Sequence, residues 1–403
     1  MELLSPAGNI EKLKYAINYG AAAVYAAGRN FGLRAKSTNF SKEELIEAVD
    51  FCHSKNKKIY ITVNIFAHNS DIDDLPEYLK FLQDIKVDAL IISDPAVFSL
   101  AKEFAPQIPI HISTQANVTS WKSAEFWYKQ GAKRIILARE LTISEIREIH
   151  EKVPEVELEM FVHGAMCMSY SGRCLLSSYL NARSANQGEC TQPCRWEYHL
   201  SEPSRPGEFF NISEDEQGTY LMNSKDLRLI ERLLEIRQAG ISSIKIEGRM
   251  KSLYYVANAT RIYREALGRI EQNKSIDQEL IAELDKISHR HYSEAFFDVF
   301  DSSQTQYHGD SAYIRTHQFL GNIIETSGNK IKAAMRAKFK VGDEIEIIFP
   351  NRKDDMKWIV DNILDEEDNP LEFTKPNTII KIILPKKVPA HGILRKKVGC
   401  DKG

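Results

Sequence analysis

Four of the six cysteines in this 403-residue chain lie within 28 residues, close enough in sequence to bind one metal centre. They are Cys167, Cys174, Cys190 and Cys194, in the spacing C-x6-C-x15-C-x3-C. Four thiolates can hold an iron–sulfur cluster, and loops rich in Gly and Ser turn sharply enough to bring them together. Zinc is the rival, but structural zinc usually takes cysteine pairs about two to four residues apart, as only Cys190 and Cys194 are. The spacing favours an iron–sulfur cluster and leaves zinc open.

The start of the chain bears on where these thiols function. The sequence MELLSPAGN has no basic segment followed by an apolar one, so it does not resemble a signal peptide. No apolar run approaches the ~18 residues of a membrane span. We therefore expect a cytoplasmic protein without a membrane partner, in which thiols stay reduced and clustered cysteines act as ligands or catalysts. Cys52 and Cys400 are predicted to be bystanders.

Further polar and charged side chains stand where short apolar runs end. In a parallel barrel, the carboxyl ends of the strands form the mouth at which active sites are built. The side chains that qualify are Asn64, Gln115, Arg139, Glu140, His163, Glu247 and Arg249. Arg139 and Arg249 can clamp carboxylates through paired hydrogen bonds. The alternative is a salt bridge between each arginine and a neighbouring glutamate, Glu140 or Glu247.

We divide these residues into predicted roles. Asn64, His163 and Glu247 are the predicted catalytic side chains, and Gln115 joins the two arginines in binding substrate. His163 lies four residues before Cys167, so it could carry a proton or orient the cysteine loop, and we favour orientation. Farther along, Lys225 and Asp226 in NSKDL are predicted to begin a helix, with Ser224 as its cap.

Eight short aliphatic or β-branched runs alternate with stretches of helical periodicity up to about residue 270. The runs are Glu2–Ser5, Ala22–Tyr25, Ile59–Asn64, Ala89–Ser93, Ile110–Thr114, Arg134–Ala138, Leu158–His163 and Ser243–Glu247. The helical stretches include Asn9–Tyr19, Lys42–Ser54, Leu75–Asp84, Ala96–Phe104, Thr119–Gln130 and Ser144–Glu151. Eight βα units without a ninth strand predict an α/β fold, a TIM-type (β/α)8 barrel.

The seventh of these units is abnormally long. Some 80 residues separate His163 from Ser243, and a loop of that length in a compact domain is usually functional. All four clustered cysteines lie in it, directly after a strand. We therefore predict a barrel domain over residues 1–300 with an iron–sulfur insertion over about 164–242.

After Phe300 the pattern changes to short alternating strands separated by Gly, Pro and Asn turns. The predicted strands are Tyr313–Arg315, Leu320–Glu325, Lys330–Ala334, Glu344–Ile348, Trp358–Ile363 and Thr378–Ile383. This spacing predicts a small antiparallel β-barrel over residues 311–399, preceded by a linker at 301–310.

The same C-terminal part carries the basic charge of the chain. Residues 311–403 contain 17 Lys and Arg against 13 Asp and Glu, a net charge of +4, which leaves −7 for residues 1–310. Either this is chance fluctuation on a solvated surface, or the lysines and arginines contact phosphates. The candidates are Lys332, Arg336, Lys338, Lys340, Lys386, Lys387, Arg395, Lys396 and Lys397. The run Ser288–Phe297 mixes His, Arg and aromatic residues, which could stack on RNA or pack in a seam between domains.

Several motifs resemble those of the collagenase-like peptidase family U-32. The run Glu159–Ser177, EMFVHGAMCMSYSGRCLLS, resembles the hallmark of the family. The stretches NQGECTQPCRW, GTYLMNSKDL and IKIEGRMKS are similar to further blocks, so the likeness covers essentially all of the predicted barrel. Within the family, NQGECTQPCRWEY, MNSKDLR and IEGRMKSLYY most resemble the tRNA hydroxylation branch.

This resemblance implies an activity and its cofactors. Members of the branch make 5-hydroxyuridine at the wobble position of tRNA without oxygen, using prephenate as co-substrate. Related members hydroxylate ubiquinone precursors and ribosomal RNA, and characterised ones carry a [4Fe-4S] cluster on four cysteines. Those four would be the clustered cysteines here. Prephenate has two carboxylates, which Arg139 and Arg249 would clamp, and Lys225 joins the substrate-binding side chains only through the resemblance.

Two other functions stay open at this point. A peptidase, as the older family name says, needs an activated nucleophile or a metal-bound water. The sequence contains neither HExxH nor GxSxG, and the one Cys–His proximity, His163 with Cys167, is lost if Cys167 binds iron. A non-catalytic iron–sulfur protein that binds RNA is the other alternative, and substrate turnover would separate it from an enzyme.

Overall fold

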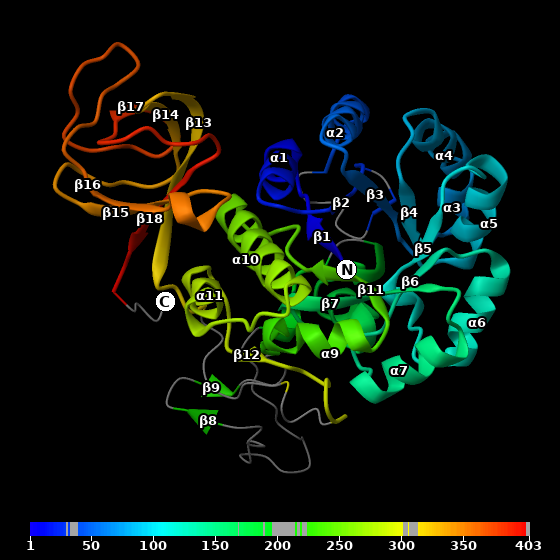
Figure 1. Ribbon diagram of the computed structural model, residues 1–403. Coiled ribbons are helices and arrows are strands. Elements are labelled where there is room, and N and C mark those ends of the chain that lie inside the picture. Colours follow the sequence, from blue (N-terminus) through cyan, green and yellow to red (C-terminus); the bar gives the residue numbers. More distant parts are fainter. Residues whose placement is uncertain are drawn as a thin grey trace, which may run out of the picture.

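The computed structural model describes residues 1–29, 31–32, 39–167, 169–187, 190–195, 214–215, 218–219, 224–300, 305 and 313–399. Eight parallel strands form a closed barrel, in which β11 pairs with both β7 and β1 (Figure 1). The strands are β1 (Glu2–Pro6), β2 (Ala23–Ala26), β3 (Lys58–Val63), β4 (Ala89–Ile92), β5 (Ile110–Ile112), β6 (Arg134–Ile136), β7 (Glu157–Ala165) and β11 (Ile241–Ile246). The predicted TIM-type barrel is therefore confirmed.

Helices lie between successive strands and cover the outside of the barrel (Figure 1). They are α1 (Ile10–Asn18), α2 (Lys42–Ser54), α3 (Asn69–Ile72), α4 (Leu75–Asp84), α5 (Pro95–Phe104), α6 (Trp121–Gln130), α7 (Ile143–Lys152), α9 (Leu233–Gln238), α10 (Leu253–Glu271) and α11 (Gln278–Ala282). Local sequence fixes several starts, since Ser41 and Thr142 each form a capping box with the glutamate three residues later. Their apolar faces pack on the strands in one continuous core, which fixes the strand ends. No helix in the described residues is long and apolar enough to pass through a bilayer.

Two short strands extend the barrel sheet at the mouth. Strand β10 (Asp226–Arg228) runs antiparallel to the end of β7, and β12 (Tyr292–Ser293) pairs with β10. The prediction that Lys225 and Asp226 begin a helix is therefore wrong, because this segment pairs with a strand far away in sequence. The helix begins later, with a 3-10 turn η5 (Ile230–Arg232) that leads into α9.

The run Ser288–Phe297 packs inside the protein. Arg290 Nη2 lies 2.8 Å from Asp226 Oδ1, and both side chains are buried, as is His289. Ile314 forms an isolated bridge with His289, so the predicted strand Tyr313–Arg315 is reduced to one residue pair. His289 and Arg290 are thus packed in a seam and are not presented to RNA, whereas His291 of the same run is half-buried.

The C-terminal part is a six-stranded antiparallel sheet in the order β16-β15-β18-β13-β14-β17. Its strands are β13 (His317–Ser327), β14 (Lys330–Met335), β15 (Glu344–Ile348), β16 (Met356–Ile359), β17 (Ile379–Ile383) and β18 (Ile393–Lys397). The sheet curls around its own apolar core, which includes Phe339, Phe349 and Trp358. It is an open half-barrel, since its edge strands β16 and β17 do not pair with each other in the described residues, although the bridge of Leu364 with Lys381 and the side chain of Asn362 link the segment after β16 to β17. The antiparallel architecture was predicted, but strand β18 was missed.

The half-barrel docks on α1, α10 and the segment after α11 through buried polar contacts (Figure 1). Tyr15 Oη donates to the carbonyl of Ile323 at 2.9 Å. The guanidinium of Arg395 is 2% exposed and lies 3.0 Å from Glu283 and 2.6 Å from Glu346. The prediction that Arg395 contacts phosphates is therefore wrong, because this side chain joins the two parts of the protein.

Candidate active site

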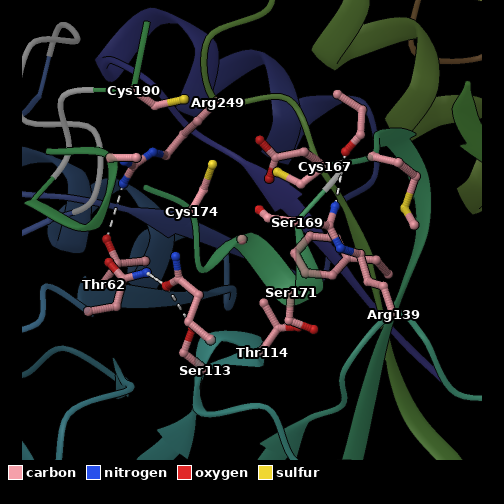
Figure 2. A pocket seen from close by; sticks show the side chains of 18 of the residues that line it. Thr62, Ser113, Thr114, Arg139, Cys167, Ser169, Ser171, Cys174, Cys190 and Arg249 are labelled. Carbon is pink, nitrogen blue, oxygen red and sulfur yellow. Dashed lines mark hydrogen bonds between the residues drawn. The ribbon is translucent and has the colours of Figure 1, made fainter. Parts of the chain in front are cut away.

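A cavity opens at the carboxyl ends of the barrel strands, and all four clustered cysteines line it. The predicted side chains that share the lining are Asn64, Gln115, Arg139, Glu247 and Arg249. They come from the ends of β3, β5, β6 and β11, where a parallel barrel builds its site. In the view of Figure 2, Arg139 and Arg249 lie on opposite sides of Cys174, and Cys167 lies near Arg139. The structure thus brings the predicted ligands and the predicted carboxylate clamps to one place.

The cysteine thiols belong to the loop that follows β7. None is in a disulfide, and Cys167 and Cys190 are exposed. The loop contains η2 (Tyr170–Gly172), α8 (Leu176–Asn181), η3 (Ala185–Gln187) and η4 (Pro193–Arg195). The backbone N–H of Leu176 donates to Cys174 Sγ at 3.4 Å, and Ser177 Oγ donates to Cys190 Sγ at 3.8 Å. Donors to sulfur are among the features by which proteins tune iron–sulfur clusters.

The fit of these residues to a cluster rests on the donor set. Four cysteines outside any disulfide line one cavity, and two of the sulfurs already accept hydrogen bonds. Within the described residues, however, no three His, Cys, Asp or Glu side chains are arranged as a ready-made metal site. The four thiols therefore line the same cavity, but they are not arranged around one point.

Glu140 fixes the first part of this loop to the barrel. Its carboxylate accepts from the backbone N–H and from the hydroxyl of Ser171, both at 2.6 Å. Ser171 has a left-handed backbone, with φ of 45°, which two strong bonds help to stabilise. Glu140 therefore anchors the turn between Cys167 and Cys174.

Arg139 lies against the first cysteine. Its Nη1 donates to the carbonyl of Ala165 at 3.0 Å, and its guanidinium faces the ring of Phe161. Burial acts to lower the pKa of Arg139, but the charges of Cys167 and Glu140 outweigh it and raise the pKa above its usual value. This side chain is therefore a permanent cation beside Cys167.

Arg249 is the second cation of the mouth. It is buried, and its Nη1 donates to Thr62 Oγ1 at 3.1 Å, as the dashed line in Figure 2 shows. Glu247, two residues earlier, accepts from Tyr25 Oη at 3.1 Å. Between the cations, Asn64 Nδ2 donates to Gln115 Oε1 at 2.8 Å, so the two amides orient each other.

His163 and Lys225 lie outside this cavity lining. A bulge in β7 between Phe161 and His163 shifts the register against β11, so His163 turns away from the barrel interior. It is 1% exposed among the rings of Tyr255, Tyr263 and Tyr292, and burial lowers its pKa to about 3. The backbone N–H of Lys225 donates to Thr305, again away from the cavity.

Comparison with known protein families identifies the family to which this fold and site belong. Residues 8–307 match Peptidase family U32, and residues 315–395 match the Peptidase family U32 C-terminal domain. The chain belongs to peptidase family U32. The resemblance seen in the sequence motifs is thereby confirmed, and the barrel with its cysteine loop is the U32 domain proper.

Among its U32 relatives, the tRNA hydroxylation protein P1 of Bacillus subtilis strain 168 is 40% identical over 401 residues, covering 98% of this chain and 94% of that protein. The tRNA hydroxylation protein P of Escherichia coli strain K12 is 40% identical, with 87% and 86% covered. A third relative, the 23S rRNA 5-hydroxycytidine C2501 synthase of the same E. coli strain, is 30% identical, covering 86% of this chain and 52% of that protein.

The sequence reasoning missed one charged side chain of the U32 cavity, Lys245. Its Nζ lies 3.4 Å from Glu159 Oε1 and 4.4 Å from the centre of the Tyr25 ring. Burial lowers the pKa of Lys245, although the carboxylate of Glu159 opposes this effect. The sequence contained a signal for Lys245. It lies two residues from both Ser243 and Glu247, and side chains two residues apart along a strand lie on the same face. With Lys245, three cations line the cavity.

Proposed function

We propose that this protein is a tRNA-modifying enzyme that hydroxylates the wobble uridine to 5-hydroxyuridine without oxygen, with prephenate as co-substrate. The observation that carries the proposal is that four cysteine side chains and three cationic side chains line one cavity at the barrel mouth. The names of the relatives support an RNA-modifying activity, since two are tRNA hydroxylation proteins and one is a ribosomal RNA hydroxycytidine synthase.

In this proposal Cys167, Cys174, Cys190 and Cys194 hold a [4Fe-4S] cluster, with zinc as the alternative metal. When bound, such a cluster supplies one-electron redox chemistry whose potential depends on the hydrogen bonds to its sulfurs. The bonds from Leu176 and Ser177 would serve that purpose.

The cations of the cavity would hold prephenate. Arg139 and Arg249 present planar guanidinium groups that can bind a carboxylate with two bonds, and Lys245 adds a point charge below them. Glu247, oriented by Tyr25, and the Asn64–Gln115 pair are the remaining polar groups that could position the uracil or exchange a proton with it. His163 supports the strand that leads to the cysteines and takes no part in the chemistry.

The described site does not pair Cys167 with His163 as a cysteine protease would need. The candidate nucleophile Cys167 faces the cavity, whereas His163 is buried behind β7 among tyrosine rings. A cysteine protease needs the base within hydrogen-bond reach of the thiol. Of the two enzymatic activities, RNA modification is therefore the one that the described geometry favours over peptide hydrolysis.

The test is reconstitution under anaerobic conditions. Purified protein should contain iron and sulfide, and should convert a uridine of an unmodified tRNA transcript to a nucleoside heavier by one oxygen only when prephenate is added. Replacing Cys174 by Ala should abolish both the visible colour and the product, whereas Cys52→Ala, a buried cysteine on α2, should change neither. Zinc in place of iron, or product without prephenate, would contradict the proposal.

A further inference from the structure

The cysteine loop presents a second face that the cavity does not use. Ser169, Ser171 and Cys174 of this loop line the cavity, whereas the neighbouring side chains of Tyr170, Arg173 and Leu175 are exposed. The exposed face continues along α8 and past its end. We call it the mouth platform, and it consists of Tyr170, Arg173, Leu175, Tyr179, Leu180 and Arg183.

The mouth platform exposes large side chains that soluble proteins usually bury. Tyr179 is 87% exposed, Leu175 71% and Tyr170 46%. Single exposed apolar residues are ordinary, but several together at the rim of a cavity mark an interaction site. A tyrosine that projects this far offers both faces of its ring to a flat partner.

The charge of the mouth platform indicates what that partner is. Residues 169–187 include Arg173 and Arg183 but no Asp or Glu. Arg173 is held at the rim, because its Nε donates to the carbonyl of Gln115 at 2.9 Å and its guanidinium faces the ring of Phe66. Glu140 and Glu145 lie near Tyr170, so the cationic part of the mouth platform is the stretch from Arg173 to Arg183. Projecting aromatic rings with interspersed cations suit an unstacked nucleic-acid strand, whose bases stack on rings and whose phosphates need cations.

The half-barrel, where the basic excess of the sequence lies, offers less. Lys332 lies 2.6 Å from Glu325, Lys396 lies 2.8 Å from Asp343, and Arg395 is buried. These three of the nine candidate side chains are therefore engaged within the protein.

We propose that RNA docks on the mouth platform, with Tyr179 stacked on a base that flanks the one entering the cavity. The inference rests on the proposed function for the identity of the RNA as substrate. An enzyme that acts on a base must take it out of its stack, and a neighbouring ring that replaces the lost stacking stabilises that state. The loop that lines the cavity with thiols would thus also hold the strand that feeds it.

The experiment measures the Kd of the iron-loaded protein for an unmodified tRNA transcript. Tyr179→Ala should weaken binding roughly tenfold or more, as loss of one stacked base does, whereas Tyr179→Phe should bind as the wild type does. Arg183→Gln should weaken binding and reduce its dependence on salt. The matched control is Tyr128→Ala, an exposed tyrosine at the carboxyl end of α6, the end of the barrel opposite to the mouth.

Iron content and prephenate binding, measured on the same variants, separate the two proposals. Loss of tRNA affinity in Tyr179→Ala with iron and prephenate binding intact supports the docking site, even if the wild type makes no hydroxyuridine. Unchanged affinity in both Tyr179→Ala and Arg183→Gln would overturn it. The docking proposal would also be overturned if these substitutions changed the oligomeric state of the protein without changing its affinity for tRNA. That result would assign the mouth platform to contacts between copies of the chain.

Discussion

Lys245 is enclosed at the floor of the cavity by the rings of Tyr25 and Phe161 and by the carboxylate of Glu159. Lys245→Met keeps the volume and removes the charge. We expect prephenate to bind roughly tenfold more weakly, because a hydrogen bond to a charged group contributes about 1.5–3 kcal/mol. Glu159 would keep its 3.0 Å contact with Arg134, so the fold should survive.

Equilibrium dialysis with prephenate measures this effect, alongside the free energy of unfolding. Lys122→Met, on the exposed side of α6, is the control and should bind prephenate normally. If Lys245→Met also binds prephenate normally, Lys245 has only a structural role in the barrel.

The contrast between Lys245 and His163 shows what strand periodicity can predict. Lys245 and Glu247 share a face of β11 because side chains alternate along a regular strand. His163 has the same parity as Phe161, which lines the cavity, yet the bulge in β7 turns it outward. A bulge depends on the pairing of two strands, so nothing in the local sequence of β7 reveals it.

The burial of His163 should make the stability of the folded protein sensitive to acid. Burial lowers its pKa to about 3, whereas the unfolded chain has a histidine pKa near ~6.5. The unfolded state therefore binds the proton first, and stability is lost as the pH falls below ~6.5. His163→Phe should remove this loss, which amounts to about 1.4 kcal/mol per pH unit.

Denaturant unfolding at pH 7, 6 and 5 under anaerobic conditions measures the slope. His68→Asn, an exposed histidine at the start of α3, serves as the control. Equal slopes in His163→Phe and the wild type would show that other groups dominate the acid response.

At the scale of elements, two hydrogen bonds of 2.6 Å from Ser171 to Glu140 hold the cysteine loop to the barrel. Glu140→Gln would remove the negative charge, so both bonds to Ser171 would become weaker, neutral hydrogen bonds. We expect slower cluster assembly and faster iron loss to a chelator, with little change in global stability. The control is Glu148→Gln, an exposed change on α7. If Glu140→Gln loses iron to the chelator no faster than this control does, Glu140 does not have this role.

The regular elements were largely predictable and the site loop was not. Strands such as β3 and β4 are nearly continuous apolar runs, so local sequence largely determines them. Strand β10 depends on its pairing with the end of β7 and with β12, and its sequence reads equally well as a helix start. Likewise β18 was missed because its basic residues resemble a surface segment, although Arg395 is buried.

At the scale of the whole molecule, Arg395 connects the half-barrel to the barrel. Its charge helps to lower the pKa of Glu283 to about 2, against the opposing effect of burial. Arg395→Met should cost about 3–5 kcal/mol, because it leaves buried carboxylates short of a partner. Lys397→Met, an exposed change on the same strand, should cost little. Denaturant unfolding compares the two, and equal midpoints would show that the buried network contributes nothing to stability.

Helix α10 touches both halves of the protein with residues only two apart. Tyr263 Oη donates to the carbonyl of Val162 at the bulge of β7, and Arg261 Nη1 lies 2.9 Å from Asp355 of the half-barrel. The strand that leads to Cys167 and the C-terminal sheet therefore rest on the same turn of one helix. Such a chain should unfold in one cooperative transition, so a truncation near residue 305 would damage the catalytic half as well as remove the other.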